Sequence, residues 1–223
     1  MANSDDSFIR EVNEELRSDQ VKYAWKRYRP LVIGLVVLIV GGAVGRETYR
    51  WWDRNNSSAS GDKFLAALQL AEQNKNDEAL AAFAALEKDG TGAYPVLAKM
   101  RAASIQQAKG DAAGAIAAFS SVGKDANAPQ AMRDLAKMRA AWLMIDTSTY
   151  DQVAAEVQVM AVPANPLANS AREALGLSAY KAGDMKKAKD WFQQIANDAG
   201  APRNVANRAQ IMLDNIAASG KAS

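Results

Sequence analysis

The chain has no cysteine and no histidine among its 223 residues. Without cysteine there are no disulfides, thiol nucleophiles or thiolate metal ligands, and without histidine there are no imidazole bases and no histidine ligands for zinc or haem. Glycine-rich phosphate loops and the GxSxG and HExxH motifs are also absent from the sequence. We therefore predict that the protein is not an enzyme, has no catalytic, cofactor-binding or metal site, and takes no small-molecule substrate.

The charges are almost balanced, with 27 basic and 25 acidic residues. The C-terminal part has no stretch of mixed basic and aromatic residues of the kind that binds nucleic acid, so we expect no nucleic-acid partner. Paired acids such as Asp77 and Glu78 are typical of a solvated helix surface rather than of an acid/base couple. The hydrophobic fraction of 49% is enough for a sizeable core.

An uncharged apolar run, LVIGLVVLIVGGAVG, occupies residues 31–45. Fifteen residues at about 1.5 Å each are too short for a hydrocarbon core of roughly 30 Å. Aromatic side chains suited to the two membrane interfaces extend the run on both sides: Tyr23, Trp25, Tyr28, Tyr49, Trp51 and Trp52. We therefore predict a single transmembrane helix over residues 30–52.

Two other interpretations of the apolar run are a buried helix of a water-soluble domain and a cleaved signal peptide. The aromatic residues on both sides and the basic entry sequence KYAWKRYR disfavour the buried helix. The long acidic segment before the run, and Trp51-Trp52 in place of small residues at a cleavage site, disfavour the signal peptide.

Basic residues near the ends of the run predict its orientation. Five precede it and three follow it, which favours a cytoplasmic N-terminus. Residues 1–29 are then a cytoplasmic tail, partly helical, that either docks on a partner or lies on the membrane surface. Residues 53–61 form a flexible polar linker, and residues 62–223 form a domain outside the cytoplasm.

Three segments of this domain align without gaps: NKNDEALAAF from Asn74, GDAAGAIAAF from Gly110 and GDMKKAKDWF from Gly183. A weaker copy, STYDQVAAEV, starts at Ser148. The aligned small residues are 36, 38 and 35 positions apart, close to the tetratricopeptide length of about 34: Ala79, Ala115, Val153 and Ala188. Further small residues lie twelve positions before them, at Ala67, Ala103, Ala141 and Gly176.

This pattern predicts four helical hairpins, because small residues on both helices let their axes approach while an aromatic side chain fills the space between them. Glycine or proline breaks separate the hairpins, and residues 203–219 form a closing helix. The repeats resemble a divergent tetratricopeptide array. The predicted fold class is therefore all-α, one transmembrane helix followed by a tetratricopeptide-like solenoid with a C-terminal capping helix.

The layout of tail, anchor, linker and divergent helical repeats resembles the ancillary subunit family of the SecYEG translocon, the YfgM-type proteins. The resemblance implies a non-catalytic protein of the bacterial inner membrane with a periplasmic repeat domain. It also implies three kinds of partner: the SecYEG translocon, a membrane-bound periplasmic chaperone and exported client proteins. The N-terminal tail is longer than is typical of that family.

The first helix of each tetratricopeptide hairpin lines the concave face of such a solenoid. The repeat register predicts a protein-binding groove lined by Phe64, Leu68, Leu97, Met100, Met138, Trp142, Leu177 and Tyr180. Methionine and aromatic side chains suit a promiscuous apolar surface. The alternative is that these residues are core between hairpins.

Three hypotheses of function follow from the sequence. The first is an adaptor that assists the translocon and periplasmic chaperones. The second is an envelope scaffold for cell-wall, division or outer-membrane assembly complexes. The third, a cryptic enzyme, would need a pocket with perturbed acids, which the sequence does not indicate.

Overall fold

Helix, turn and helix alternate throughout the computed structural model, which describes residue 46 and residues 58–220. The chain divides into two units, Met1–Asn55 and Asn56–Ser223, and the second holds all the elements that follow. A helix over residues 58–72 comes first. The later helices are α2 (Asn76–Asp89), α3 (Tyr94–Ala108), α4 (Ala112–Lys124), α5 (Gln130–Met144), α6 (Tyr150–Val157), the 3-10 helix η1 (Gln158–Met160), α7 (Ala168–Lys181), α8 (Met185–Ala196) and α9 (Arg203–Ala218). The described residues contain no strand.

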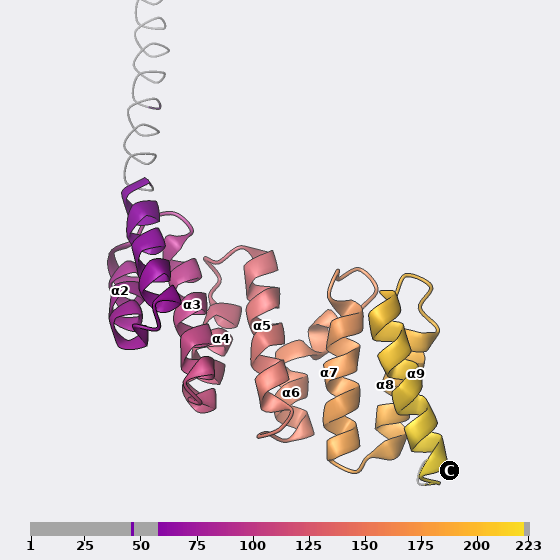
Figure 1. Cartoon of the computed structure of the whole chain (residues 1–223). Coiled ribbons are helices and arrows are strands. Elements are labelled where there is room, and N and C mark those ends of the chain that lie inside the picture. Colours follow the sequence, from indigo (N-terminus) through magenta and orange to yellow (C-terminus); the bar gives the residue numbers. More distant parts are fainter. Residues whose placement is uncertain (1–45, 47–57, 221–223) are drawn as a thin grey trace, which may run out of the picture. The chain divides into compact units, whose positions relative to one another are not determined.

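These helices form four consecutive hairpins and a closing helix (Figure 1). The helix over residues 58–72 pairs with α2 around a shared apolar core. Helix α3 pairs with α4, α5 with α6, and α7 with α8, and each hairpin packs on the next. Helix α9 packs chiefly on α8 and ends the row. The all-α, tetratricopeptide-like fold predicted from the sequence is thus confirmed for the described residues.

The turns inside the hairpins use the residues that open the sequence repeats. Gly110 and Gly183 have φ angles of 86° and 80°, a left-handed conformation that glycine adopts without strain. The aspartate after each glycine caps the next helix: Asp111 accepts from the Gly114 amide at 2.8 Å and Asp184 from the Lys187 amide at 3.0 Å. The Lys187 backbone and side chain lower the pKa of Asp184.

The core of each hairpin is the predicted contact between a small residue and a large one. The large residues, each at most 1% exposed, are Phe83, Phe119, Val157 and Phe192. The small residues that the sequence placed opposite them are buried too: Ala67, Ala103, Ala141 and Gly176. At Gly176 an added Cβ would lie 2.8 Å from Phe192 Cζ, so the close approach of α7 and α8 requires glycine.

The predicted linker over residues 53–61 differs from the structure at its end. Residues 58–61 are already helical, and the first hairpin therefore begins earlier than predicted. Ser60 Oγ accepts from the Thr91 amide at 3.1 Å, and a Cβ on Gly61 would lie 2.7 Å from the Tyr94 hydroxyl. Residues 58–61 are thus held in a helix by contacts with residues some 30 positions away. The polar composition of this segment alone does not indicate a helix.

The predicted transmembrane helix over residues 30–52 lies outside the described residues, apart from Arg46, which is helical. The predicted tail over residues 1–29 lies outside them as well. Among the described residues, no helix has both the length and the apolar character needed to cross a membrane.

Candidate protein-binding groove

A groove of about 440 Å³ runs between the first helices of the third and fourth hairpins and the closing helix. Helices α5, α7 and α9 supply its lining. We call this lining the apolar groove, and it consists of Trp142, Glu173, Leu177, Arg208, Ile211 and Met212. Three helices that are separate in the sequence thus form one surface.

Large apolar side chains in the apolar groove are open to solvent. Trp142 is 39% exposed and Ile211 is 58% exposed, whereas Leu177 and Met212 are half-buried against the core of the last hairpin. Covering such side chains with another apolar surface is favourable, since each square ångström removed from water contributes about 25 cal/mol. Exposed tryptophan is also enriched among the residues that dominate binding between proteins. The groove therefore has the surface chemistry of a protein-binding site.

An ion pair joins two of the helices that form the apolar groove. Arg208 donates from Nε to Glu173 Oε1 at 2.5 Å and from Nη2 to Glu173 Oε2 at 2.7 Å. The Glu173 side chain is 4% exposed and the Arg208 side chain is 50% exposed. Hydrogen bonding to Glu173 raises the pKa of Arg208. Because both carboxylate oxygens accept from arginine, the only acid in the groove is neutralised, and the surface offered to a partner is apolar with a cationic edge.

Two of the residues predicted to bind partners, Trp142 and Leu177, lie in the apolar groove. The prediction for Met138 needs correction. Met138 is 4% exposed and belongs to the core shared by the second, third and fourth hairpins. Its side chain has no free surface to offer a partner, because residues of the neighbouring hairpins cover it.

The other predicted groove residues are half-buried and lie outside the apolar groove. Phe64 packs edge-on against Phe83, with ring centroids 5.5 Å apart, and Leu68 lines a separate hollow of about 370 Å³. Met100 packs against the central core and Tyr180 against the last hairpin's core. Leu97 is half-buried on α3. The residues predicted to line a single groove thus lie in several separate places rather than on one surface.

Sequence reasoning did not assign Arg208, Ile211 and Met212 to the groove, because residues 203–219 were interpreted only as a closing helix. A signal for them exists in the repeat register. Arg208 follows Arg172 by 36 residues, within the range of 35 to 38 residues that separates the earlier repeats. Helix α9 therefore occupies the place of a first helix of a further hairpin, and first helices line the groove.

Chemically, the apolar groove is suited to binding rather than to reaction. Its charged groups are one carboxylate and one guanidinium, which are hydrogen-bonded to each other. Within residues 58–220, no cluster of three or more acidic side chains could hold a metal ion.

One family model, described as a tetratricopeptide repeat-like domain, matches residues 22–218. The matched range includes the apolar run at residues 31–45 as well as the four hairpins. No curated protein matches the chain.

Proposed function

Since the chain belongs to the tetratricopeptide repeat-like family, whose domains are typically non-catalytic scaffolds for protein partners, we propose that it binds proteins through the apolar groove. The observation that carries this proposal is the exposure of Trp142 and Ile211 on adjoining helices around one hollow. Large contiguous apolar patches are rare on the surfaces of soluble proteins, and they commonly mark interaction sites. The half-exposed Arg208 at the edge adds hydrogen-bond donors for backbone carbonyls of a bound segment.

The proposed cellular setting is the bacterial inner membrane. Residues 30–52 span the membrane once, the N-terminal tail is cytoplasmic, and the hairpins lie in the periplasm. The apolar run, its aromatic flanks and the excess of basic residues before it support this topology. In that setting the groove would meet newly exported polypeptides, whose apolar side chains are not yet buried.

We further propose that the protein is an adaptor for the SecYEG translocon and a membrane-bound periplasmic chaperone. The layout of anchor and divergent repeats supports this assignment through its resemblance to the translocon's ancillary subunits. The alternative is a scaffold for cell-wall, division or outer-membrane assembly, which would occupy the same groove permanently. Affinity purification from solubilised membranes separates the two, because a client is captured transiently whereas a scaffold partner co-purifies in fixed proportion.

Truncating the exposed side chains of the apolar groove should weaken partner capture. Trp142→Ala with Ile211→Ala removes two apolar anchors, and loss of a large anchor commonly costs about 2 kcal/mol, roughly thirtyfold in affinity. Crosslinking in intact cells that express the full chain measures the yield of captured proteins. The matched control is Val159→Ala, which truncates an equally apolar side chain that is 69% exposed and lies outside the groove.

The control variant should keep the crosslinks of the parent chain. If the groove variant keeps its helical circular dichroism and its crosslinks are also unchanged, then binding lies elsewhere and the proposal is wrong. Loss of the helical signal would instead place both side chains in the core, which also contradicts the proposal.

The proposed topology has its own test. Protease added to spheroplasts should remove the residues beyond about Trp52 and spare the N-terminal tail, because only the periplasmic part is accessible. Tags at the two ends of the chain, followed by immunoblotting, report which part survives. Protection of the hairpins until the membrane is lysed would reverse the orientation and remove the periplasmic adaptor hypothesis.

A further inference from the structure

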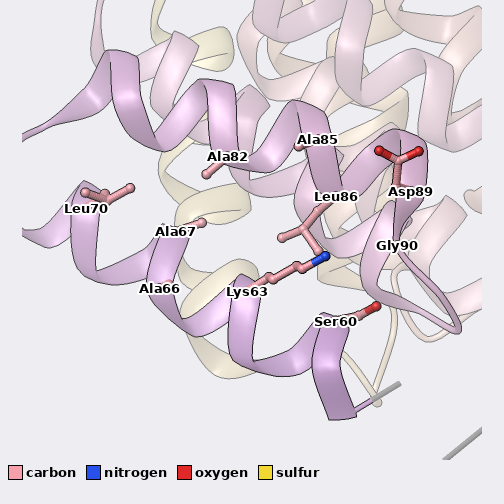
Figure 2. Close-up of a pocket in the computed structure, with 10 residues that line it drawn as sticks. All are labelled: Ser60, Lys63, Ala66, Ala67, Leu70, Ala82, Ala85, Leu86, Asp89 and Gly90. Carbon is pink, nitrogen blue, oxygen red and sulfur yellow. The ribbon is translucent and has the colours of Figure 1, made fainter. Parts of the chain in front are cut away.

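The first hairpin has an apolar surface, on the side away from the second hairpin, that no described residue covers. A hollow of about 320 Å³ lies there between the helix over residues 58–72 and α2 (Figure 2). We call this surface the N-terminal face, and its principal lining residues are Lys63, Ala66, Leu70, Ala82, Ala85 and Asp89. Small apolar side chains form its floor, and charged side chains lie at one end.

In the repeat register, a cation recurs at the position of Lys63. The equivalent residues follow at intervals of 36, 38 and 35: Lys99, Lys137 and Arg172. Each of these three contacts the end of the preceding hairpin. Lys99 Nζ lies 2.8 Å from Glu87 Oε1, Lys137 Cγ lies 2.6 Å from where a Cβ on Gly123 would be, and Arg172 Nε donates to the Ala161 carbonyl at 3.2 Å.

The contacted residues are themselves equivalent, since Glu87, Gly123 and Ala161 are also spaced by 36 and 38. One interface is therefore used three times along the row. Lys63 occupies the corresponding position in the first hairpin, and no hairpin precedes that one among the described residues. Within the described residues, the N-terminal face is thus a stacking surface with no neighbouring hairpin.

The exposed fractions of equivalent residues also indicate that the floor of the N-terminal face corresponds to a stacking surface of the later hairpins. The equivalents of Ala66 are Ala102, which is half-buried, and Ala140 and Leu175, which are both 0% exposed. Ala66 itself is exposed. The later hairpins cover this position wholly or in part with the helix before them, so the exposure of Ala66 reflects that no described helix packs before it.

The charges on the N-terminal face identify the occupant. Lys63 lies on one wall and Asp89 at the end of the other (Figure 2), and neither has an ion-pair partner within the described part of the chain. A surface that carries one charge of each sign can pair with itself when a twofold axis brings residue i of each copy to residue j of the other. We propose that the N-terminal face binds the N-terminal face of a second copy of this chain, with Lys63 against the partner copy's Asp89.

A helix of another protein fits the charges less well. Glu87 alone satisfies Lys99 in the second hairpin, but a helix of another protein would need an acid for Lys63 and also a base for Asp89. The twofold arrangement satisfies both charges on both copies. The pairing is independent of the apolar groove, and only its strength rests on the proposed membrane anchor, which would raise the effective concentration of two neighbouring chains.

The absence of native cysteine makes a direct test possible, because an introduced cysteine is the only thiol of its chain. Two differently tagged full-length copies, one with Ala66→Cys and one with Ala85→Cys, are co-expressed and oxidised mildly in intact cells. A disulfide requires Cα atoms about 4.4–6.8 Å apart, so a two-tag dimer on a non-reducing gel reports contact between the faces. The control pair is Ala113→Cys with Ala155→Cys, two exposed helix positions on later hairpins.

We expect a two-tag dimer from the first pair and only background from the control pair. Adding Lys63→Glu or Asp89→Lys alone should lower the dimer yield by about fivefold, since each dimer then contains two like-charge pairs. Adding both changes should restore it. Equal yields from test and control pairs, failure of the double reversal to restore the dimer, or a disulfide adduct with another protein would each overturn the proposal. None of these outcomes bears on partner capture by the apolar groove.

Discussion

Replacing Gly176 with leucine is expected to lower the free energy of unfolding by about 1–3 kcal/mol or more. Gly176 lies on α7, where a Cβ would come 2.8, 2.9 and 3.1 Å from three carbons of the Phe192 ring. Real side chains essentially never show such contacts, so the ring or the helix must move. Phe192 is 0% exposed and the core of the last hairpin surrounds it, which leaves no space for the ring to occupy.

Urea unfolding of the purified full chain, followed by circular dichroism, measures the change through the midpoint at constant slope. Ala113→Leu, at an exposed position on α4, is the matched control for adding a leucine and should change the midpoint little. Combining Gly176→Ala with Phe192→Leu should lower the free energy of unfolding by less than the sum of the two single changes. The smaller leucine relieves the clash with the alanine Cβ, and that Cβ fills part of the void that the leucine leaves. A Gly176→Leu chain with the parent's midpoint would contradict the packing described for α7 and α8.

Replacing Arg208 with methionine should also destabilise the protein, by about 1–3 kcal/mol. The destabilisation comes from the Glu173 carboxylate that is left without its partner, rather than from the lost attraction between the two charges. The Glu173 side chain is 4% exposed and both its oxygens accept from Arg208. Without the guanidinium, a buried carboxylate between α7 and α9 has neither a cation nor these two donors.

The double variant Glu173→Met with Arg208→Met separates this cause from a loss of packing. It removes the buried charge together with its partner, and apolar replacement of a buried pair is often neutral. We therefore expect the midpoint of urea unfolding to recover most of the loss seen for Arg208→Met alone. Lys187→Met, which removes an exposed cation paired with Asp184 at 3.2 Å, is the surface control and should have a small effect. A double variant as unstable as Arg208→Met would show that the side chain of Arg208 acts by packing.

Local sequence determined much of the fold because the hairpin is a short-range structure. Gly110 with Asp111 specifies a left-handed turn followed by a helix cap within four residues, and the backbone angle and the capping bond agree with this expectation. The same holds for Gly183 with Asp184. In the third hairpin no residue of the turn has a positive φ, and the second helix is capped in another way, by a capping box between Thr149 and Gln152.

Burial on the binding side was harder to predict, since it depends on what covers a helix. Met138 and Trp142 are four residues apart on α5, which places them on the same face of the helix, and both were predicted to line the groove. Met138 is nevertheless 4% exposed, in the core shared with neighbouring hairpins, while Trp142 is 39% exposed. Periodicity identifies a face of a helix but not how far along that face the next helix extends.

For the described residues, the sequence by itself therefore determined the all-α, tetratricopeptide-like fold, the number of hairpins, and the small and large residues that pack within each pair. Only the tertiary structure decided where the apolar groove lies and which apolar face of the first hairpin no described residue covers. The ion pair between Glu173 and Arg208 joins residues 35 positions apart, and the ion pair between Lys99 and Glu87 joins the second hairpin to the first. The physical reason is one of range: turns and hairpin cores depend on neighbours along the chain, whereas a groove or a free stacking face depends on how whole hairpins are placed against one another.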